Sequence, residues 1–353
     1  MKFVVVVCLF LASVTSFAQD DIRVHFIAVG QGDSTLIEFP GCGIMLVDTG
    51  TTMSESATRL TDYLDVFFTV HPEYNNTIDL IINTHPHADH IRALDEVLAN
   101  YTVLNYVDNG HTPLRRNSRK VREHTHEDGT SIKVRAVPDS EVVAEGYLGL
   151  SDDTIDPFDC VDEIKGNSDP TISILSGRIE DQPDGWTRRE FQNLNNHSLV
   201  IRLDYGDASF LFTGDMEDVA IEYMVDYYED TGALDVDVYQ VGHHGSVNGT
   251  TNALIHAMTP LISVISMGEW DFGMDTNRRG TAWQYGHPRS KIVRDLSVAT
   301  KRRRSAAIDV MVANGSKAFT GMRIKKAIYG TGWDGNIIVT ASFDGGYRVT
   351  VGN

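Results

Sequence analysis

Three histidines and one aspartate lie within six residues, at His85, His87, Asp89 and His90. Imidazole nitrogen and carboxylate oxygen suit Zn²⁺, and Mn²⁺ or Fe²⁺ can use the same ligands. In an extended loop, His85 and His87 point the same way and can bind one metal ion, while Asp89 and His90 turn toward a second. Histidines that only pack in a core do not need this clustering, so the run predicts a metal site.

Further candidate ligands follow or precede later segments that we expect to be strands. Asp215 ends one such strand, His243 and His244 follow the next, and His197 leads into an earlier one. A carboxylate at a strand end can bridge two cations, and additional histidines can complete both coordination shells. We therefore expect two divalent metal ions, with zinc favoured over manganese or iron.

The elements that must position these residues alternate between strands and helices, which favours a layered α/β fold. The run 78–82, just before His85, is almost continuously apolar, as is typical of a strand covered on both faces. Asp344-Gly345-Gly346 between two β-rich runs indicates a hairpin near the C terminus. Other strands are expected over 22–29, 35–39, 43–47, 198–203, 208–212, 236–241 and 261–267, and helices over 54–68, 91–100 and 217–228.

The periodicity fades between about residues 109 and 190. Residues 151–170 are rich in Asp but lack the spacing of an EF-hand calcium loop, so a solvated insertion is expected there. A length of 353 residues would allow two domains. The strand pattern instead favours one domain over 19–353, carrying an irregular insertion over about 109–190.

The first 18 residues have the layout of a secretory signal peptide. One Lys precedes an apolar run, and the small residues Ser16 and Ala18 occupy the −3 and −1 positions of a cleavage site. The apolar run is shorter than the ~20 residues needed to span a bilayer. We therefore expect a secreted or periplasmic protein without a stable membrane anchor. Cys42 and Cys160 then remain, either as a disulfide or as two separate thiols.

The chain has 49 Asp and Glu against 30 Lys and Arg, a formal net charge of -19. This acidity argues against broad binding to nucleic acid or anionic membranes, because both depend on positive potential. Two basic runs, 115–122 and 301–304, could contact phosphates locally, although solvated surface or a helix face is the favoured interpretation. A small-molecule or phosphodiester substrate fits best, and net charge does not favour nucleic acid.

Taken together, the motifs resemble those of the metallo-β-lactamase superfamily. The residues that carry the resemblance are the HPHADH run 85–90, Thr213-Gly214-Asp215 and His243-His244-Gly245-Ser246. Further runs resemble the metallohydrolase domain of ComEC-type DNA-uptake proteins and its stand-alone relatives: residues 29–34, 47–50, 195–200 and 285–288. The resemblance extends from about residue 22 to the C terminus, without the insertion.

This resemblance implies a four-layer αββα sandwich with a dinuclear site at one edge of the sheets. His85 and His87 would bind the first metal ion. Many members of the superfamily place a third histidine where His197 stands, whereas the ComEC-like pattern has a variable residue there. Asn195 or water is therefore an alternative to His197.

For the second metal ion, the resemblance implies Asp89, His90 and His243 as ligands, with Asp215 bridging the two ions. Asp48 would support the metal-binding loop without touching a metal.

Two neighbouring cations lower the pKa of a bridging water and hold the oxygens of the group that is attacked. Asp89 would orient this water, and His244 or His287 could protonate the leaving group. For His287, packing beside Pro288 is an equal alternative. The leading hypothesis is an exported, metal-dependent phosphodiesterase or nuclease. The alternatives are a hydrolase of carboxylic esters, lactones or β-lactams, and a non-catalytic binding protein on the same scaffold.

Overall fold

The computed structural model describes residues 21–39, 41–51, 57–111, 116–126, 129–150, 158, 161–162, 166–167, 169–270 and 281–352. The expected signal peptide and Cys160 lie outside this part of the chain. Cys42 is disulfide-bonded, so it is not a separate thiol. Among the described residues, no helix combines the length and the apolar character needed to cross a bilayer.

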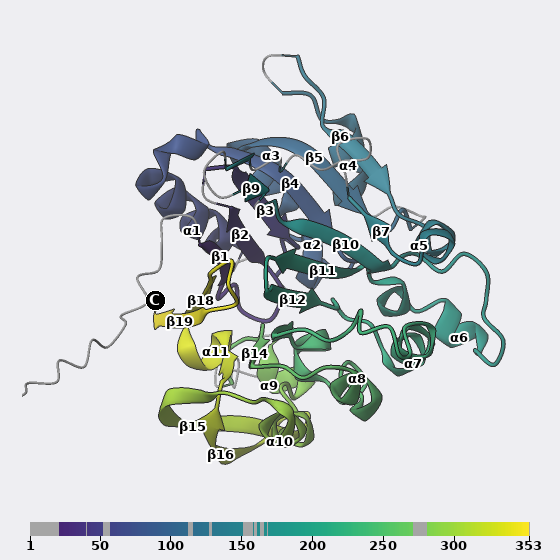
Figure 1. Cartoon of the computed structure of the whole chain (residues 1–353), viewed down its shortest axis with the longest axis vertical. Coiled ribbons are helices and arrows are strands. Elements are labelled where there is room, and N and C mark those ends of the chain that lie inside the picture. The colour runs from purple at the N-terminus through teal and green to yellow at the C-terminus, as the bar shows by residue number, and fades with distance from the viewer. Residues whose placement is uncertain are drawn as a thin grey trace, which may run out of the picture.

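The first sheet has eight strands in the order β19-β18-β1-β2-β3-β4-β5-β6 (Figure 1). Strands β3 to β6 pair in parallel, so their carboxyl ends meet at one edge. The strands span Ile22–Phe26 (β1), Thr35–Phe39 (β2), Gly43–Val47 (β3), Thr77–Asn83 (β4), Thr102–Asp108 (β5), Lys133–Ala136 (β6), Asn336–Ala341 (β18) and Tyr347–Gly352 (β19).

The second sheet has seven strands in the order β17-β14-β13-β12-β11-β10-β7. Here β12, β13, β14 and β17 are parallel. The strands span Leu148–Gly149 (β7), Thr171–Ser176 (β10), Val200–Tyr205 (β11), Ala208–Phe212 (β12), Val238–Gln240 (β13), Ile262–Ile265 (β14) and Ile328–Gly330 (β17). A separate small pair joins Val161–Asp162 (β8) and Gly166–Asn167 (β9).

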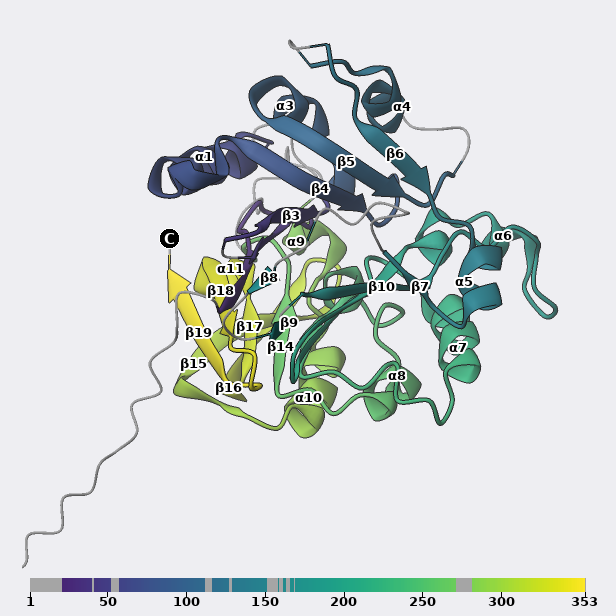
Figure 2. The ribbon, with the colours of Figure 1, turned by 45° about the horizontal axis from the view of Figure 1, so that its top comes forward.

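Helices cover the outer face of each sheet (Figure 2). The α-helices span Ala57–Val70 (α1), Ala88–Ile91 (α2), Leu94–Asn100 (α3), Arg116–Glu123 (α4), Asp139–Glu145 (α5), Arg188–Phe191 (α6), Asp218–Tyr227 (α7), Asn252–Ala257 (α8), Ala282–Tyr285 (α9), Ser290–Ala299 (α10) and Thr331–Asp334 (α11). Short 3₁₀ turns span Pro72–Tyr74 (η2), Leu194–His197 (η3) and Gly242–Gly245 (η4).

Three apolar clusters hold these layers together. The central cluster lies between the two sheets, where Phe26 of β1 stacks on Phe212 of β12. A second cluster joins the first sheet to α1 and α3, through residues such as Leu64 and Leu94. A third joins the other sheet to α7, α8 and α10, including Ile292. Each layer buries an apolar face against the next, so the expected αββα sandwich is confirmed.

The region 109–190 differs from the insertion that the sequence predicts. It supplies β6 to the first sheet and β7 and β10 to the second, and β10 is almost fully buried. The run TISILS of β10 alternates between polar and apolar residues only as far as Ile174, where the register shifts, so the strand signal is short. Only parts of this region are therefore additions to the sandwich.

A two-stranded ribbon, formed by β15 (Arg303–Gly315) and β16 (Ala318–Lys326), lies outside both sheets. Its inner face packs against α10 through Val310, Val312 and Ile324. The sequence did not predict this ribbon. The basic run 301–304, interpreted as solvated surface or a helix face, instead leads into β15, and Arg304 is buried against Asp334.

Candidate metal centre

The carboxyl ends of parallel strands from both sheets converge on one region. Asp48 follows β3 and His85 follows β4, while Asp215 follows β12 and His243 follows β13. Loops at this edge of an open α/β sheet are the usual place for ligand sites. The fold therefore brings together candidate residues that are up to about 200 positions apart in sequence.

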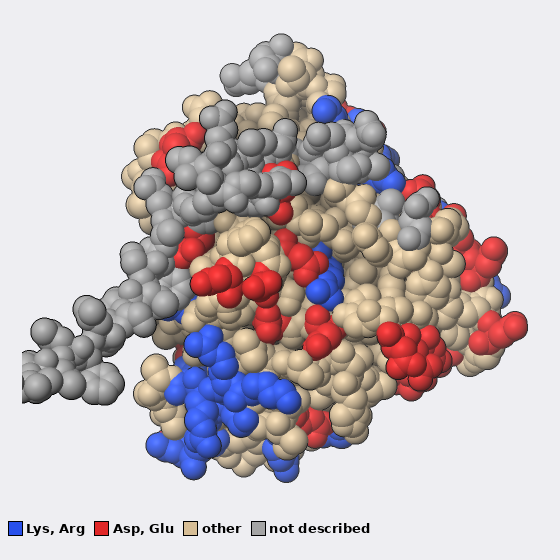
Figure 3. Space-filling model, viewed as in Figure 1, with Lys and Arg blue, Asp and Glu red and all other residues tan. Residues whose placement is uncertain are grey.

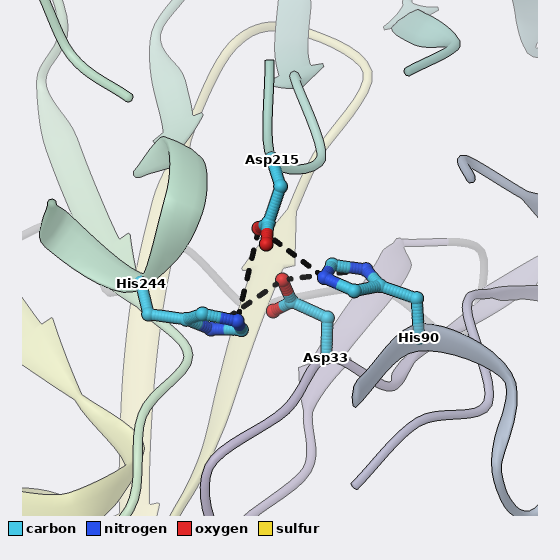
Figure 4. A group of neighbouring side chains, drawn as sticks. All are labelled: Asp33, His90, Asp215 and His244. Atoms are coloured by element: carbon cyan, nitrogen blue, oxygen red, sulfur yellow. Dashed lines mark ion pairs between the residues drawn. The ribbon is translucent and has the colours of Figure 1, made fainter. Parts of the chain in front are cut away.

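A buried group of four residues forms the centre of this region: Asp33, His90, Asp215 and His244 (Figure 4). One ligand atom from each lies within 4.8 Å of those of the others. His90 Nε2 is 3.2 Å from Asp215 Oδ1, and His244 Nε2 is 3.7 Å from the same oxygen. Two imidazoles and two carboxylates at this spacing can hold a divalent cation.

Both imidazoles of this group are held by their Nδ1 atoms. His90 Nδ1 donates to Asp48 Oδ2 at 2.6 Å, and His244 Nδ1 donates to the carbonyl oxygen of Ser266 at 2.9 Å. Each Nε2 is buried and makes no hydrogen bond, as is also true of Asp215 Oδ1. Metal-binding histidines in proteins are oriented in this way, so the donor set fits a metal ion.

Asp48 fixes the loop that carries the histidine cluster. Its carboxylate accepts hydrogen bonds from the Asn83 side chain and from the backbone and hydroxyl of Thr84, each at 2.8 Å. Together with the bond from His90, these hydrogen bonds compensate the negative charge of Asp48. Burial of that charge without partners would be unfavourable in free energy. Gly50 lets this loop pass close to the metal loop, since a Cβ there would lie 1.8 Å from the Asp89 carbonyl oxygen.

His85 and His87 form a second convergent pair. His85 Nε2 lies 3.1 Å from His87 Nδ1. Two nitrogens bound to one tetrahedral zinc are separated by about 3.3 Å, given Zn–N bonds of about 2.0–2.1 Å. The ring of His85 also lies 4.2 Å from that of His90, centroid to centroid. The pair is therefore placed to share one cation beside the four-residue group.

Asp89 stands at the partly exposed side of the site. Its Oδ2 atom is 3.5 Å from His244 Nε2. Burial would raise the pKa of Asp89, but the contact with His244 and the nearby His90 hold it well below its usual range. Asp89 is thus a carboxylate at neutral pH, able to bind a cation or to accept a proton.

His243 and His244 both border Asp215, from different sides. The sequence predicts His243 as the metal ligand and His244 as the proton donor. In the structure, His244 Nε2 belongs to the four-residue group, and His243 Nε2 lies 3.7 Å from Asp215 Oδ2. Both residues have positive φ, at 49° and 51°. Such a left-handed backbone costs about 1–3 kcal/mol per residue and is concentrated at functional sites.

His287 and His197, both predicted as site residues, lie in different surroundings. His287 stacks on His243, with 5.8 Å between ring centroids, and burial together with nearby His244 lowers its pKa to about 3. His197 is not a member of the four-residue group: its Nε2 donates to the Phe191 carbonyl oxygen at 2.7 Å, and its ring packs on His111. The structure therefore brings His287, but not His197, beside the other candidates.

Asp33 is the member of the group to which the sequence interpretation gave no role. It lies in the turn between β1 and β2, where its carboxylate accepts a hydrogen bond from Gln240 Nε2 at 2.9 Å. Burial is the main influence on the pKa of Asp33 and raises it. The signal was present in the run 29–34, which carried the family resemblance without indicating that this carboxylate reaches the histidines.

The buried charges of the group compensate one another. Burial would lower the pKa of His244, yet Asp215 and Asp33 raise it to about 10, and the carboxylates of Asp215 and Asp48 likewise raise the pKa of His90. Burial would raise the pKa of Asp215, whereas the histidines around it hold it well below its usual range. A divalent cation competes with these imidazole protons for the same carboxylates.

The chain matches the family model of the metallo-beta-lactamase superfamily over residues 27–269 and belongs to that superfamily. The donor group described above is the part of the chain that could hold a divalent metal ion in a protein of this superfamily.

Two bacterial proteins are similar to the chain in sequence. ComE operon protein 3 of Bacillus subtilis is 26% identical over 285 residues, which cover 78% of this chain and 30% of that protein. Recombination protein 2 of Haemophilus influenzae is 40% identical over 77 residues, which cover 22% of this chain and 9% of that protein. The chain thus spans less than a third of the length of either relative.

Among solved structures, the metallo-beta-lactamase fold protein YhfI from Bacillus subtilis is similar, with 15% identity and a TM-score of 0.35. The match covers 62% of this chain and 71% of that protein.

Proposed function

We propose that the protein is an exported hydrolase of phosphodiester bonds that uses two divalent metal ions. The observation that carries the proposal is the position of Asp215. One of its oxygens faces His90 and His244, and the other faces His243. A buried carboxylate whose two oxygens face different imidazoles can bind through both oxygens, as a bridge between two cations must.

The residues would divide into two sets of ligands. His85 and His87 would hold one cation, and Asp89, His90 and His243 would hold the other, with Asp215 between them. The sequence predicts His244 as a proton donor, but His244 is also placed to bind the second cation. Its Nδ1 is fixed by a carbonyl oxygen, and its Nε2 faces the group. Zinc suits this nitrogen-rich set, and manganese or iron can also use it.

When bound, the cations would supply a water that is ionised at neutral pH and would neutralise charge on the substrate oxygens. Asp89 would orient this water, because its carboxylate is ionised and lies at the open side of the group. His287 borders the group, but its pKa of about 3 leaves it uncharged at neutral pH, so it can orient the leaving oxygen rather than protonate it. A phosphodiester requires this combination of an activated water, charge neutralisation and a positioned leaving oxygen.

The similarity to Recombination protein 2 adds support, because recombination is a process of nucleic acids. The expected signal peptide supports export. Mass spectrometry of the protein recovered outside the cytoplasm should show a chain that begins at Gln19.

Hydrolysis of bis-p-nitrophenyl phosphate tests the proposed reaction. The purified protein, loaded in turn with Zn²⁺, Mn²⁺ or Fe²⁺, should release nitrophenol, and Asp89→Ala should reduce the rate by about 100-fold, as expected for a general acid–base residue. His256→Gln is the matched control, because His256 is exposed on α8. No turnover with any of these metals, or equal turnover by Asp89→Ala, would disprove the proposal.

The two alternatives give different results in the same preparation. Faster hydrolysis of nitrocefin or p-nitrophenyl acetate than of the phosphodiester would indicate a lactamase or an esterase. A protein that purifies without metal and binds none when zinc is added would indicate a non-catalytic binding protein.

A further inference from the structure

The basic residues of this acidic protein are concentrated near the β15–β16 ribbon. Residues 301–326 include eight Lys or Arg and a single Asp, whereas the whole chain has a formal net charge of -19. Figure 3 shows Lys and Arg side chains gathered on one part of the surface, at the position of β15 and β16 in Figure 1. The ribbon therefore creates a local positive potential that the net charge conceals.

Much of this charge is available to a ligand. Lys301, Arg303 and Lys325 have exposed side chains, and the structure shows no ion pair for them within its described part. Arg323 is also exposed and pairs only with Asp309, at the surface. We call Lys301, Arg303, Arg323 and Lys325 the basic ribbon. Exposed pairs of this kind hold their partners weakly, so a phosphate can compete for Arg323.

The outer face of β16 arranges part of this charge in a line. Met322 and Ile324 turn toward the core, so the alternate residues Arg323 and Lys325 are directed to solvent, and Phe319, on the same side of the strand, is half-buried. Phe319 and Lys325 are separated by six residues, or about 20 Å of strand. This length suits several consecutive phosphates of an extended strand of nucleic acid.

At the tip of the ribbon, aromatic side chains lead toward the metal centre. Phe319 stacks on Trp283 of α9, with ring centroids 5.6 Å apart and an interplanar angle of 20°. Tyr285, also on α9, is 47% exposed, and its ring lies 6.1 Å from that of His287. His287 in turn stacks on His243 beside Asp215. Charge, aromatic rings and candidate metal ligands thus follow one another across adjoining elements.

We propose that the basic ribbon and the aromatic step of Trp283, Tyr285 and Phe319 bind a single-stranded nucleic acid and direct it to the metal centre. This inference rests on the proposed function and names its substrate class and docking surface. Phosphates would contact the Lys and Arg side chains of the basic ribbon, and unpaired bases would stack on the aromatic step. Proteins that bind single strands combine these two kinds of contact. A duplex keeps its bases stacked inside, so it would gain nothing from the aromatic step.

Binding can be measured by fluorescence anisotropy with a labelled oligothymidylate of about 20 nucleotides, longer than the roughly 4–16 nucleotides of a typical site. The zinc-loaded full protein is titrated on ice, and a denaturing gel verifies that the probe stays intact. The triple variant Arg303→Ser, Arg323→Ser, Lys325→Ser should bind at least 30-fold more weakly. The slope of log affinity against log salt should fall by about 2, since each lost phosphate contact removes about 0.7.

A matched control removes three exposed arginines from other surfaces: Arg119, Arg188 and Arg189, each changed to Ser. It carries the same change of net charge, so its affinity and salt slope should remain those of the wild type. Equal losses in both triple variants would overturn the inference, because net charge alone would then explain the binding.

The aromatic step is tested by Trp283→Leu, with Phe319→Leu as a second variant in case the first unfolds. Each should weaken oligothymidylate binding about 5- to 20-fold without changing the salt slope, since stacking is not ionic. A 20-base-pair duplex should bind more weakly than the single strand and should not respond to either variant. Equal binding of duplex and single strand, or stronger binding to phosphatidylserine vesicles, would overturn the inference.

The two proposals fail in different ways. Wild-type protein that binds oligothymidylate through the basic ribbon but hydrolyses no phosphodiester would disprove the proposed function and leave the docking surface in place. Wild-type protein that hydrolyses bis-p-nitrophenyl phosphate, with oligothymidylate binding unchanged in the ribbon variant, would disprove the docking surface alone.

Discussion

The metal centre and the basic ribbon both concentrate charge, but in opposite environments. In the metal centre, each buried imidazole and carboxylate has a specific neighbour, as His90 has Asp48 and Asp215. In the basic ribbon, cations such as Arg303 and Lys325 face solvent. Water screens the ribbon, so its residues act collectively and each contributes little. Burial makes the metal centre depend on every member, because a lost partner leaves a charge uncompensated.

The largest expected effect is that of Asp215→Asn. The amide cannot bridge two cations, and it removes the negative charge that faces His90, His243 and His244. We expect about a 1,000-fold loss of kcat/KM for bis-p-nitrophenyl phosphate, or about 4 kcal/mol of transition-state stabilisation, together with loss of bound metal. Elemental analysis and steady-state kinetics measure the two effects. Asp204→Asn is the control, since Asp204 lies on β11 and pairs with Arg202. Full metal content in Asp215→Asn would show that Asp215 is not a ligand.

Two ion pairs near the ribbon compare burial directly, without any metal. Arg304 and Asp334 are each 5% exposed, whereas Arg323 and Asp309 are both well exposed. Arg304→Ala should lower the free energy of unfolding by about 3 kcal/mol, because Asp334 would remain buried without a cationic partner. Arg323→Ala should lower it by less than about 1 kcal/mol. Urea denaturation measures both, and similar values for the two variants would contradict the contrast drawn between buried and exposed charge.

Asp33→Asn tests the residue to which the sequence interpretation gave no role. The amide keeps the shape of the side chain but removes its charge from His244 and His90. We expect a 10- to 100-fold loss in metal affinity or activity, the range found when a supporting group of a metal site is removed. Metal titration followed by kinetics measures it. A wild-type zinc affinity in this variant would place Asp33 outside the machinery of the site.

The features that could be predicted from the sequence are those that depend on residues close together in the chain. The HPHADH run lies within six residues, and strands such as β4 carry their own apolar signal, so both could be recognised without the fold. Asp33 could not be assigned, because its nearness to His244 depends on two sheets packing together. The ribbon was missed for another reason. Its strands interrupt their alternation at an irregular register between Arg303 and Ile308, which hides the strand period.

The smallest expected effect concerns Glu38, a buried carboxylate of β2 whose partners are Arg23 and His25 rather than the candidate metal ligands. Its Oε1 atom is 2.7 Å from Arg23 Nη1, and its Oε2 atom is 3.8 Å from His25 Nε2. Burial would raise the pKa of Glu38, but His25 and Arg23 lower it to about 2. In the unfolded chain the group titrates near its ordinary value of 4.5. Its contribution to stability is therefore complete above about pH 4.5 and is lost as the pH falls toward 2.

Glu38→Gln should consequently be less stable than the wild type by about 1–3 kcal/mol at pH 6. The difference should be much smaller near pH 2, because the wild-type carboxyl is then almost fully protonated when unfolded and half-protonated when folded. Urea denaturation at both pH values measures the change, and Glu73→Gln, an exposed neighbour of His71, is the control. A gap that stays constant with pH would mean that Glu38 stabilises the fold by packing and neutral hydrogen bonds. The charged partners of this buried carboxylate would then not determine its contribution to stability. Dependence on such partners is the property that distinguishes the metal centre from the basic ribbon.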